Sequence, residues 1–342
     1  MRLPITPPIS AMEAKIQSDL PRGPGWQYEP KWDGFRALAF RDGDEVLVFS
    51  RNQRPLTRYF PELVPALRGI APQRIVLDAE IVIFTGKGTD FDAMLMRIHP
   101  ASSRIQMLAA QTPASLIAFD VLADGDEDFR GLPLRERRRR LTTLLGSPPA
   151  PVFLSPVTED REVALSWLKQ YDGTGLDGIV AKRLDDVYHP GERAMVKVKQ
   201  QRTADCVVGG FRWGKDGKRV GSLLLGVYDG RHLEYIGHTS SFDDETRHDL
   251  VKLLEPHRGA SDFGEGRTPG GPSRWATERS MEWEPLRPEL VCEVAFDRLE
   301  GGRFRHGVRF VRWRPDKSPN ECTYAALKRE ASVELKNLFK PG

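Results

Sequence analysis

The sequence predicts a mixed α+β fold in two domains. Its 342 residues can bury more than one core, and the texture of the chain changes near residue 201. Before that point, long apolar strands such as Arg74–Ile83 alternate with helical segments. Beyond it, short strands separated by Gly-rich turns predominate. We therefore expect a first domain over residues 1–201 and a second over residues 202–342.

The composition is that of an ordinary soluble protein, and we expect it in the cytoplasm. Hydrophobic residues make up 39%, charged residues 29%, and no apolar run is long enough for a bilayer. The Pro-rich start lacks the apolar core of a secretion signal. Three cysteines without a Cys-x-x-Cys pair predict buried, inert thiols rather than disulfides or a zinc site. A net charge of +3 neither establishes nor excludes a nucleic-acid partner.

The first domain is predicted to contain an antiparallel sheet. Two apolar strands, Phe35–Phe40 and Glu45–Ser50, flank the turn residues Asp42-Gly43-Asp44 and predict a hairpin. Residues 1–25 are expected to be irregular, with one short helix over Met12–Leu20. Further helices are predicted over Tyr59–Leu67, Leu134–Leu144 and Val163–Tyr171, and further strands over Arg74–Ile83, Leu116–Leu122, Leu176–Arg183 and Met195–Lys199.

Lys31, just before the hairpin, is the candidate nucleophile. A free lysine has a pKa near roughly 10.4 and stays protonated at neutral pH until burial or nearby cations lower that pKa. Lys197 and Lys199 alternate with two valines, so a strand would place both ammonium groups on one face. Paired cations on one face suit a bound anion such as a nucleotide phosphate. We therefore expect this pair to lie near Lys31 and to lower its pKa.

Several polar or aromatic residues interrupt the apolar strands, and each allows two interpretations. Asp78 and Glu80 share one face of an apolar strand, where they need hydroxyls, a metal ion, basic side chains or a structural salt bridge. Asp177 and Lys182 bracket another strand, either as ligands of a metal and a phosphate or base, or as ordinary polar strand ends. Phe119 is either a base-stacking platform or a core aromatic.

Basic residues gather at three further places. Arg51 and Asn52 directly follow the second hairpin strand, where they could face a ligand. The helix over residues 134–144 carries five arginines, which we interpret chiefly as a solvated face. Arg303 and Arg305 begin the densest mixture of basic and aromatic residues, which extends to residue 317 and suits a phosphate backbone.

The second domain is predicted to be a small closed barrel of the oligonucleotide-binding (OB) type, because five short strands follow one another at suitable spacing. A helix over Asp243–Leu254 should separate the third strand from the fourth. We expect residues 259–273, rich in Gly and Pro, to form a mobile loop and Thr323–Phe339 to form a terminal helix. The predicted strands are Cys206–Trp213, Ser222–Tyr228, Leu233–Ile236, Leu290–Phe296 and Val308–Arg314.

The order of the motifs resembles that of the ATP-dependent DNA ligases, in particular the stand-alone bacterial enzymes related to the ligase domain of ligase D. A single Lys-x-Asp-Gly is weak evidence, but seven segments in the family's order are strong evidence. They are Lys31-Trp32-Asp33-Gly34-Phe35-Arg36, Ser50-Arg51-Asn52, Leu77-Asp78-Ala79-Glu80, Ala118-Phe119-Asp120-Val121, Leu176–Arg183, Lys197-Val198-Lys199 and Arg314-Pro315-Asp316-Lys317.

The resemblance implies a nucleotidyltransferase (adenylation) domain followed by an OB-fold, with ATP in the cleft and Mg²⁺ or Mn²⁺ beside it. It implies a monomer that seals nicked double-stranded DNA during repair. Lys31 would carry AMP, and Asp33, Lys197 and Lys199 would complete the catalytic set, the lysine pair holding the α-phosphate. Glu29, Phe119 and Lys182 would contact the nucleotide. Arg36 and Glu80 would approach the ribose or the DNA 5′-phosphate, and Glu80 and Asp177 would bind the metal ion. The residues that would contact DNA are Arg51, Asn52, Arg303 and Arg305. Those that would orient the leaving pyrophosphate are Arg314, Asp316 and Lys317.

Two departures and two alternatives accompany this resemblance. Many relatives have tryptophan just before the paired lysines, where Met195 and Val196 stand here, which affects only local packing. Many relatives have glutamate where Asp177 stands, so this carboxylate reaches less far toward a metal ion. An RNA ligase or a GTP-using capping enzyme would share the same lysines, although the context of Lys182 and the OB-fold favour a DNA ligase. A non-catalytic OB-fold protein that binds nucleic acid is the third hypothesis, and the intact lysines argue against it. A partner polymerase or end-binding protein is supported by no segment.

Overall fold

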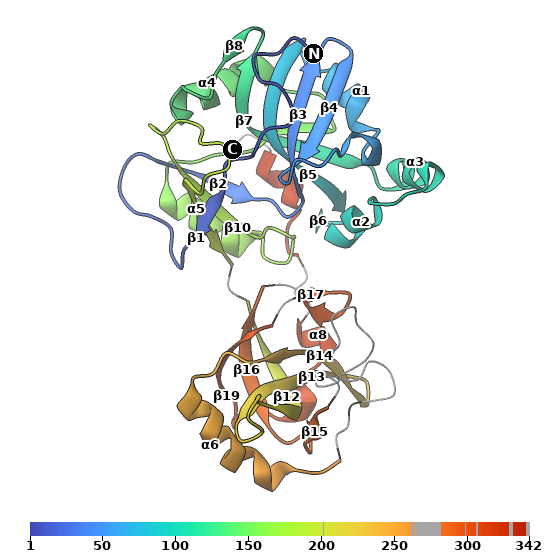
Figure 1. Cartoon of the computed structure of the whole chain (residues 1–342), viewed down its shortest axis with the longest axis vertical. Coiled ribbons are helices and arrows are strands. Elements are labelled where there is room, and N and C mark those ends of the chain that lie inside the picture. The colour runs from blue at the N-terminus through green and yellow to red at the C-terminus, as the bar shows by residue number, and fades with distance from the viewer. Residues whose placement is uncertain are drawn as a thin grey trace. The chain divides into compact units, whose positions relative to one another are not determined.

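The computed structural model describes residues 1–200, 202–260, 263, 282–297, 299–305, 307–327 and 331–339, grouped in two compact units. Residues 1–200 and 330–342 form the first unit, and residues 201–329 form the second (Figure 1). The sequence predicts that residues 202–342 stay together, whereas residues 331–339 group with the first unit. They do so because Leu335 and Leu338 are buried there beside Trp32.

The larger sheet of the first unit is antiparallel apart from one short edge strand. Its order is β4-β3-β5-β7-β8, with β6 paired to β5 and β9 parallel to β7. The predicted hairpin is confirmed as β3 and β4, because residues 37–42 pair with residues 45–50. The strands are β3 (Phe35–Asp42), β4 (Glu45–Ser50), β5 (Arg74–Thr85), β6 (Gly88–Thr89), β7 (Ala114–Asp124), β8 (Glu127–Asp128) and β9 (Val152–Leu154).

A second sheet carries Lys31 and the lysine pair. Its order is β1 (Ala14–Ile16), β11 (Met195–Lys199), β10 (Gly178–Arg183) and β2 (Trp26–Lys31). The predicted helix over Met12–Leu20 is wrong, because β1 pairs in parallel with β11 and the chain is extended there. Lys31 lies opposite Gly178. A Cβ on Gly178 would collide with the Val198 carbonyl oxygen, so glycine allows this close approach of β10 to β11.

The α-helices of the first unit flank its sheets (Figure 1). The expected helices near residues 134–144 and 163–171 are confirmed as α4 and α5, and Asp160 caps the second by accepting from Glu162 and Val163. The expected helix over Tyr59–Leu67 is shorter, because Pro61 disfavours helical backbone at Phe60. The helices are η1 (Thr57–Tyr59), α1 (Leu63–Arg68), α2 (Phe91–Met96), α3 (Ser102–Gln111), α4 (Leu134–Leu145) and α5 (Arg161–Gln170).

The second unit is the predicted five-stranded barrel. Its strands follow the order β14-β13-β12-β16-β19, and a parallel bridge between Thr239 and Val308 joins the two ends. All three cysteines are free and buried, as predicted. The main elements are β12 (Arg202–Trp213), β13 (Val220–Asp229), β14 (His232–Thr239), α6 (Asp244–Leu254), β16 (Val291–Phe296) and β19 (Arg309–Trp313). The short elements are η2 (Glu255–His257), β15 (Glu284–Pro285), β17 (Leu299–Glu300), β18 (Arg303–Phe304) and η3 (Pro319–Glu321).

The predicted terminal helix over Thr323–Phe339 is wrong for the residues described. They form a four-residue helix, α8 (Tyr324–Leu327), and a separate 3₁₀ helix, η4 (Leu335–Phe339), with non-helical residues 331–334 before η4. Residues 328–330 and most of the predicted loop 259–273 lie outside the described residues. Every helix in the described ranges is too short or too polar to span a lipid bilayer.

Candidate active site

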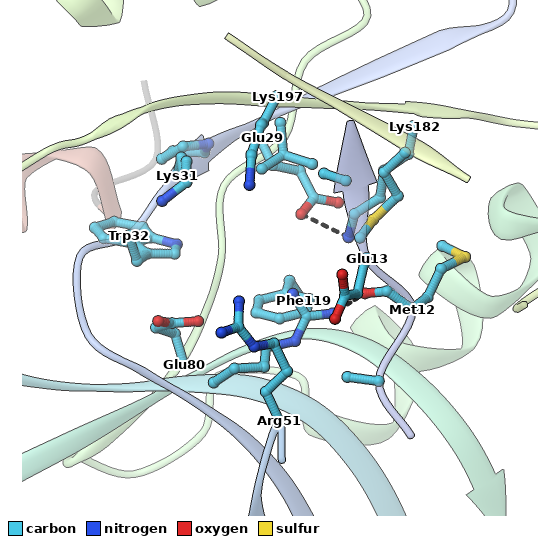
Figure 2. Close-up of a pocket in the computed structure, with 16 residues that line it drawn as sticks. Met12, Glu13, Glu29, Lys31, Trp32, Arg51, Glu80, Phe119, Lys182 and Lys197 are labelled. Atoms are coloured by element: carbon cyan, nitrogen blue, oxygen red, sulfur yellow. Dashed lines mark hydrogen bonds and ion pairs between the residues drawn. The ribbon is translucent and has the colours of Figure 1, made fainter. Parts of the chain in front are cut away.

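A pocket opens between the two sheets of the first unit (Figure 2). It contains about 810 Å³ of space not occupied by atoms, part of which is open to solvent. Lys31 and Lys197 project from the smaller sheet, and Glu80 and Phe119 project from the larger one. The predicted site residues that line the pocket are Glu29, Lys31, Arg36, Arg51, Glu80, Phe119, Lys182 and Lys197.

Lys31 is paired with a carboxylate. Its Nζ donates a hydrogen bond to Oδ2 of Asp177, and the Lys199 Nζ lies 3.6 Å from the same oxygen. Burial alone would lower the pKa of the Lys31 ammonium, but the carboxylates of Asp177, Glu80 and Asp33 together outweigh burial, with Asp177 contributing most. The Lys31 pKa is therefore raised above its usual value of 10.5. The expectation that neighbouring cations lower the Lys31 pKa is wrong, because neighbouring carboxylates raise it.

The lysine pair lies on one face of β11, as the alternation predicts. Val196 and Val198 are buried, whereas Lys197 and Lys199 are partly exposed. Burial lowers the pKa of Lys197, and the positive charges of Lys31, Lys199 and Arg51 lower it further. These cations converge from β2, β11 and the end of β4. Their mutual repulsion would be relieved by an anion among them.

Phe119 lines the pocket, and two cations lie over its ring. The Arg36 Cζ lies 4.3 Å from the ring centroid, and the Lys182 Nζ lies 4.6 Å from it. Lys182 also pairs with a Glu29 carboxylate oxygen at 2.8 Å, the dashed contact in Figure 2. Gln27 Nε2 donates to the other Glu29 oxygen at 2.7 Å. This end of the pocket therefore combines a nearly buried aromatic ring with a fixed carboxylate and ammonium group.

The two carboxylates of β5 have different environments. Asp78 is fully buried and accepts two hydrogen bonds from Arg36, at 2.5 and 2.6 Å, and one from the Tyr188 hydroxyl at 2.6 Å. The structural salt bridge is thus the correct interpretation for Asp78. Glu80 lines the pocket, and burial raises its pKa to about 7 although Arg36 and Lys31 oppose the shift. The negative charge of Asp33 raises the Glu80 pKa further.

The predicted residues of the last motif lie in the second unit. One oxygen of Asp205 accepts from the Arg314 Nη1 at 2.8 Å, and the other accepts from the Lys317 Nζ at 2.6 Å. Asp316 accepts three further hydrogen bonds from Arg314, and this contact lowers the Asp316 pKa to about 2. The motif therefore forms a hydrogen-bonded cluster on the barrel that is centred on Asp205.

The remaining predicted site residues are at least partly exposed to solvent. Asn52 follows Arg51 at the surface, and Arg305 is likewise exposed. The Arg303 guanidinium lies 5.1 Å from the ring centroid of Tyr235 in the second unit. Asp33 is close enough to raise the pKa values of both Lys31 and Glu80.

Sequence reasoning missed three residues that shape this site. Glu13 lines the pocket, but it belongs to a segment expected to be irregular, and no local pattern indicates its role. Tyr188 supports Asp78 from a loop with no distinguishing motif. Trp32 lines the pocket and donates from its indole Nε1 to the Ser155 Oγ at 3.0 Å. The position of Trp32 directly after Lys31 is the sequence feature that could have indicated its place in the site.

Comparison with known proteins identifies the family. Residues 7–199 match the model described as ATP dependent DNA ligase domain, and residues 216–317 match ATP dependent DNA ligase C terminal region. The chain belongs to the ATP-dependent DNA ligases. The resemblance stated from the motifs is confirmed, and the adenylation domain and OB-fold of this ligase are those of the family.

Individual relatives extend over the full length of this ligase. It is 47% identical to DNA ligase C of Mycobacterium tuberculosis, covering 100% of this chain and 99% of that protein. The crystal structure of the ligase domain from M. tuberculosis LigD matches with 27% identity and a TM-score of 0.49, covering 94% of this chain and 98% of that one. A structure of Lig E DNA ligases shares the fold, with 18% identity, a TM-score of 0.52 and coverage of 89% and 99%.

Proposed function

We propose that this ligase seals nicks between a 3′-hydroxyl and a 5′-phosphate in duplex DNA through a covalent Lys31–AMP intermediate. The observation that carries the proposal is that Lys31 and Lys197 face Glu80 and Phe119 across one pocket (Figure 2). The pocket therefore offers a nucleophile, cations for phosphate and an aromatic surface for a base. Because one chain supplies all of its side chains, we propose that a monomer performs the first step.

The nucleotide is proposed to lie with its base against Phe119 and its phosphates among the lysines. The pocket is lined with Phe119, which suits stacking with adenine, and the Glu29–Lys182 pair offers an acceptor and a donor beside it. Lys197, whose pKa is lowered by burial and by neighbouring positive charges, would be stabilised by an α-phosphate nearby. This arrangement puts the α-phosphorus within reach of Lys31.

The first reaction forms a bond from the Lys31 Nζ to the α-phosphorus and breaks the bond to pyrophosphate. Lys31 must lose a proton before it attacks, since an ammonium group has no free electron pair. The Asp177 carboxylate, which accepts a hydrogen bond from that ammonium, is placed to receive the proton or to pass it to solvent. Lys197 and Lys199 stabilise the charge that develops on the phosphate oxygens. AMP then passes to the DNA 5′-phosphate, and the 3′-hydroxyl displaces it.

Asp177 and Glu80 are proposed to hold Mg²⁺ or Mn²⁺. Both lie close to Lys31, but no group of three or more potential metal ligands occurs in the described part of the chain. This donor set fits Mg²⁺, which commonly binds through one or two carboxylates and completes its shell with water and substrate phosphates. The ion would offset charge on the triphosphate. Asp33 is proposed to support the site through its charge beside Lys31 and Glu80.

The other basic residues are proposed to contact DNA or pyrophosphate. Arg36 has two nitrogens committed to Asp78, so it would approach the ribose or the 5′-phosphate only with its remaining edge. Arg51, which lines the pocket, and the exposed Asn52 would bind a DNA phosphate. In the second unit, the residues proposed to contact DNA are Arg303 and Arg305, and those proposed to orient pyrophosphate are Arg314, Asp316 and Lys317.

Labelling with α-³²P ATP tests the proposal. The wild type should form a stable adduct that mass spectrometry locates at Lys31. Lys31→Ala should abolish the label, and so should Lys31→Arg, because guanidinium does not deprotonate in the accessible pH range. Lys15→Ala, at an exposed position in β1 of the same sheet, is the matched control and should label normally. A labelled Lys31→Ala protein, or an adduct at another residue, would overturn the assignment.

A further inference from the structure

Residues 331–339, here called the terminal segment, pack into the first unit on the side of Trp32. The segment lies beyond both family matches, which end at residue 317, so the comparisons assign it no role. Leu335 and Leu338 are 1% and 8% exposed. Burial of two leucines anchors the segment through the hydrophobic effect. The cluster that contains them also includes Trp32, Val82, Ile117, Tyr171 and Leu176, with Phe84, Phe153 and Phe339 packed against it.

The cluster joins the two sheets that form the pocket. Trp32 directly follows β2, and Leu176 lies just before β10, so both belong to the smaller sheet's side. Val82 lies in β5 and Ile117 in β7 of the larger sheet. The terminal segment packs against residues from both sides. It therefore helps to set the spacing between the lysines of one sheet and the Glu80 and Phe119 side chains of the other.

Phe339 is separated from the pocket by a single ring. Its ring stacks on Trp32 with centroids 5.2 Å apart and an angle of 8° between the planes. Phe339 also contacts Phe153, with centroids 4.8 Å apart. Trp32 itself lines the pocket and adjoins Lys31 in the sequence. The stack and the Ser155 hydrogen bond together fix the orientation of the indole and of the backbone that carries Lys31.

Polar contacts hold the start of the terminal segment in register. The Leu335 backbone N–H donates to the Lys87 carbonyl at 2.8 Å, and the Lys87 Nζ donates to the Ala331 carbonyl at 3.1 Å. The Lys336 Nζ lies 5.0 Å from the ring centroid of Phe84. Hydrogen bonds depend on direction, so these contacts fix the position of the segment along the chain more precisely than apolar packing alone. Figure 1 shows the segment in red among the strands of the first unit.

We infer that the terminal segment is a positioning element for adenylation, with Phe339 acting on Lys31 through Trp32. The inference rests on the proposed Lys31–AMP chemistry. A small displacement of a nucleophile from its line of attack slows a reaction strongly, even when the disturbed contact lies outside the pocket. The chain reaches this segment only after passing through the second unit. Residues that follow the second unit in the sequence therefore support one wall of the pocket from behind Trp32.

Phe339→Ala tests the inference in the full-length protein. Two rates are compared: formation of lysyl-AMP from ATP, which uses Lys31 as nucleophile, and sealing of a pre-adenylated nick, which does not. At saturating ATP, we expect the first to fall on the order of tenfold and the second to change less than about twofold. Phe339→Tyr keeps the aromatic stack and should restore adenylation. Glu334→Ala changes an exposed residue of the same segment and should leave both rates unchanged.

The outcomes separate positioning from folding. If Phe339→Ala lowered both rates equally, the segment would act only on the amount of folded protein, and the inference would fail. Unchanged adenylation in this variant would also overturn it. Neither result would affect the proposed function, which depends on the Lys31→Ala experiment. A selective loss of adenylation that Phe339→Tyr reverses is the expected result.

Discussion

The Lys31 ammonium donates a hydrogen bond to the Asp177 carboxylate, and this pair determines the protonation state of the candidate nucleophile. Burial favours a neutral Lys31, but the adjacent negative charge raises its pKa overall. An ammonium group has no free electron pair, so Lys31 must lose this proton before it can act as the proposed nucleophile.

Asp177→Asn should therefore lower the Lys31 pKa. The substitution removes the largest of the contributions that raise this pKa, whereas burial, which lowers it, remains. The measurement is the pH dependence of trace acetylation of Lys31, followed by mass spectrometry of its peptide. Exposed Lys15 serves as an internal reference in both proteins. Coincident titration midpoints for Lys31 in the wild type and the variant would show that Asp177 does not control its charge.

The sequence predicts local elements well and distant pairings poorly. The β3–β4 hairpin follows from adjacent strands and a turn, and the exposed lysines of β11 follow from simple alternation. The strand β1 escapes prediction, because its partner β11 lies far along the chain and a three-residue strand has no period to detect. The Lys31–Asp177 pair is missed for the same reason, since its partners come from separate segments.

Glu80→Gln should change the pH dependence of stability. The Glu80 pKa is about 7 in the fold and 4.5 for an ordinary glutamate, so between these values the folded state keeps a proton that the unfolded chain has lost. Stability therefore falls as pH rises through this window, by up to about 3 kcal/mol. Glutamine has no proton to lose. The stability of Glu80→Gln relative to wild type should rise from pH 5 to pH 8.

Urea unfolding of both proteins at the two pH values measures this change. Glu159→Gln, at an exposed position between β9 and α5, is the matched control and should show no such trend. A stability difference between Glu80→Gln and wild type that is the same at pH 5 and pH 8 would contradict the prediction.

Arg137→Ala should destabilise the first unit by about 3–5 kcal/mol, because it leaves a buried carboxylate without its partner. Arg137 is 0% exposed and pairs with Asp120, which is 1% exposed, through contacts of 2.9 and 3.0 Å. Thermal or urea unfolding measures the loss. Arg139→Ala on the same helix is the control, since that side chain is 74% exposed and its pair with Glu136 contributes little. Equal losses of unfolding free energy in Arg137→Ala and Arg139→Ala would contradict the prediction that only the buried pair stabilises the unit substantially.

The spacing of residues in α4 identifies a buried arginine that the composition of the helix does not. The arginine run was interpreted as a solvated face, which is wrong for Arg137. Leu134, Arg137 and Leu141 recur at intervals of three and four residues, which places Arg137 on the buried face of α4. The period of the apolar residues, rather than the number of arginines, identifies the buried one.

Asp205→Asn should slow adenylation more than the sealing of a pre-adenylated nick. The two oxygens of Asp205 hold Arg314 and Lys317 side by side on the barrel, at 2.8 and 2.6 Å. Asparagine keeps the shape but loses the charge that offsets the repulsion between these two cations. If they orient pyrophosphate as proposed, only the step that releases pyrophosphate should lose rate, on the order of tenfold.

Comparison with Arg314→Ala and Lys317→Ala decides what a negative result means. Asp229→Asn, an exposed position in β13, is the control and should leave every step unchanged. Arg314→Ala and Lys317→Ala could slow adenylation while Asp205→Asn does not. The Asp205 carboxylate would then be dispensable, because the remaining contacts, including the Arg314–Asp316 pair, suffice to position the two cations. If the cation variants also adenylate normally, the motif on the barrel has no part in releasing pyrophosphate, and the pocket of the first unit performs that step alone.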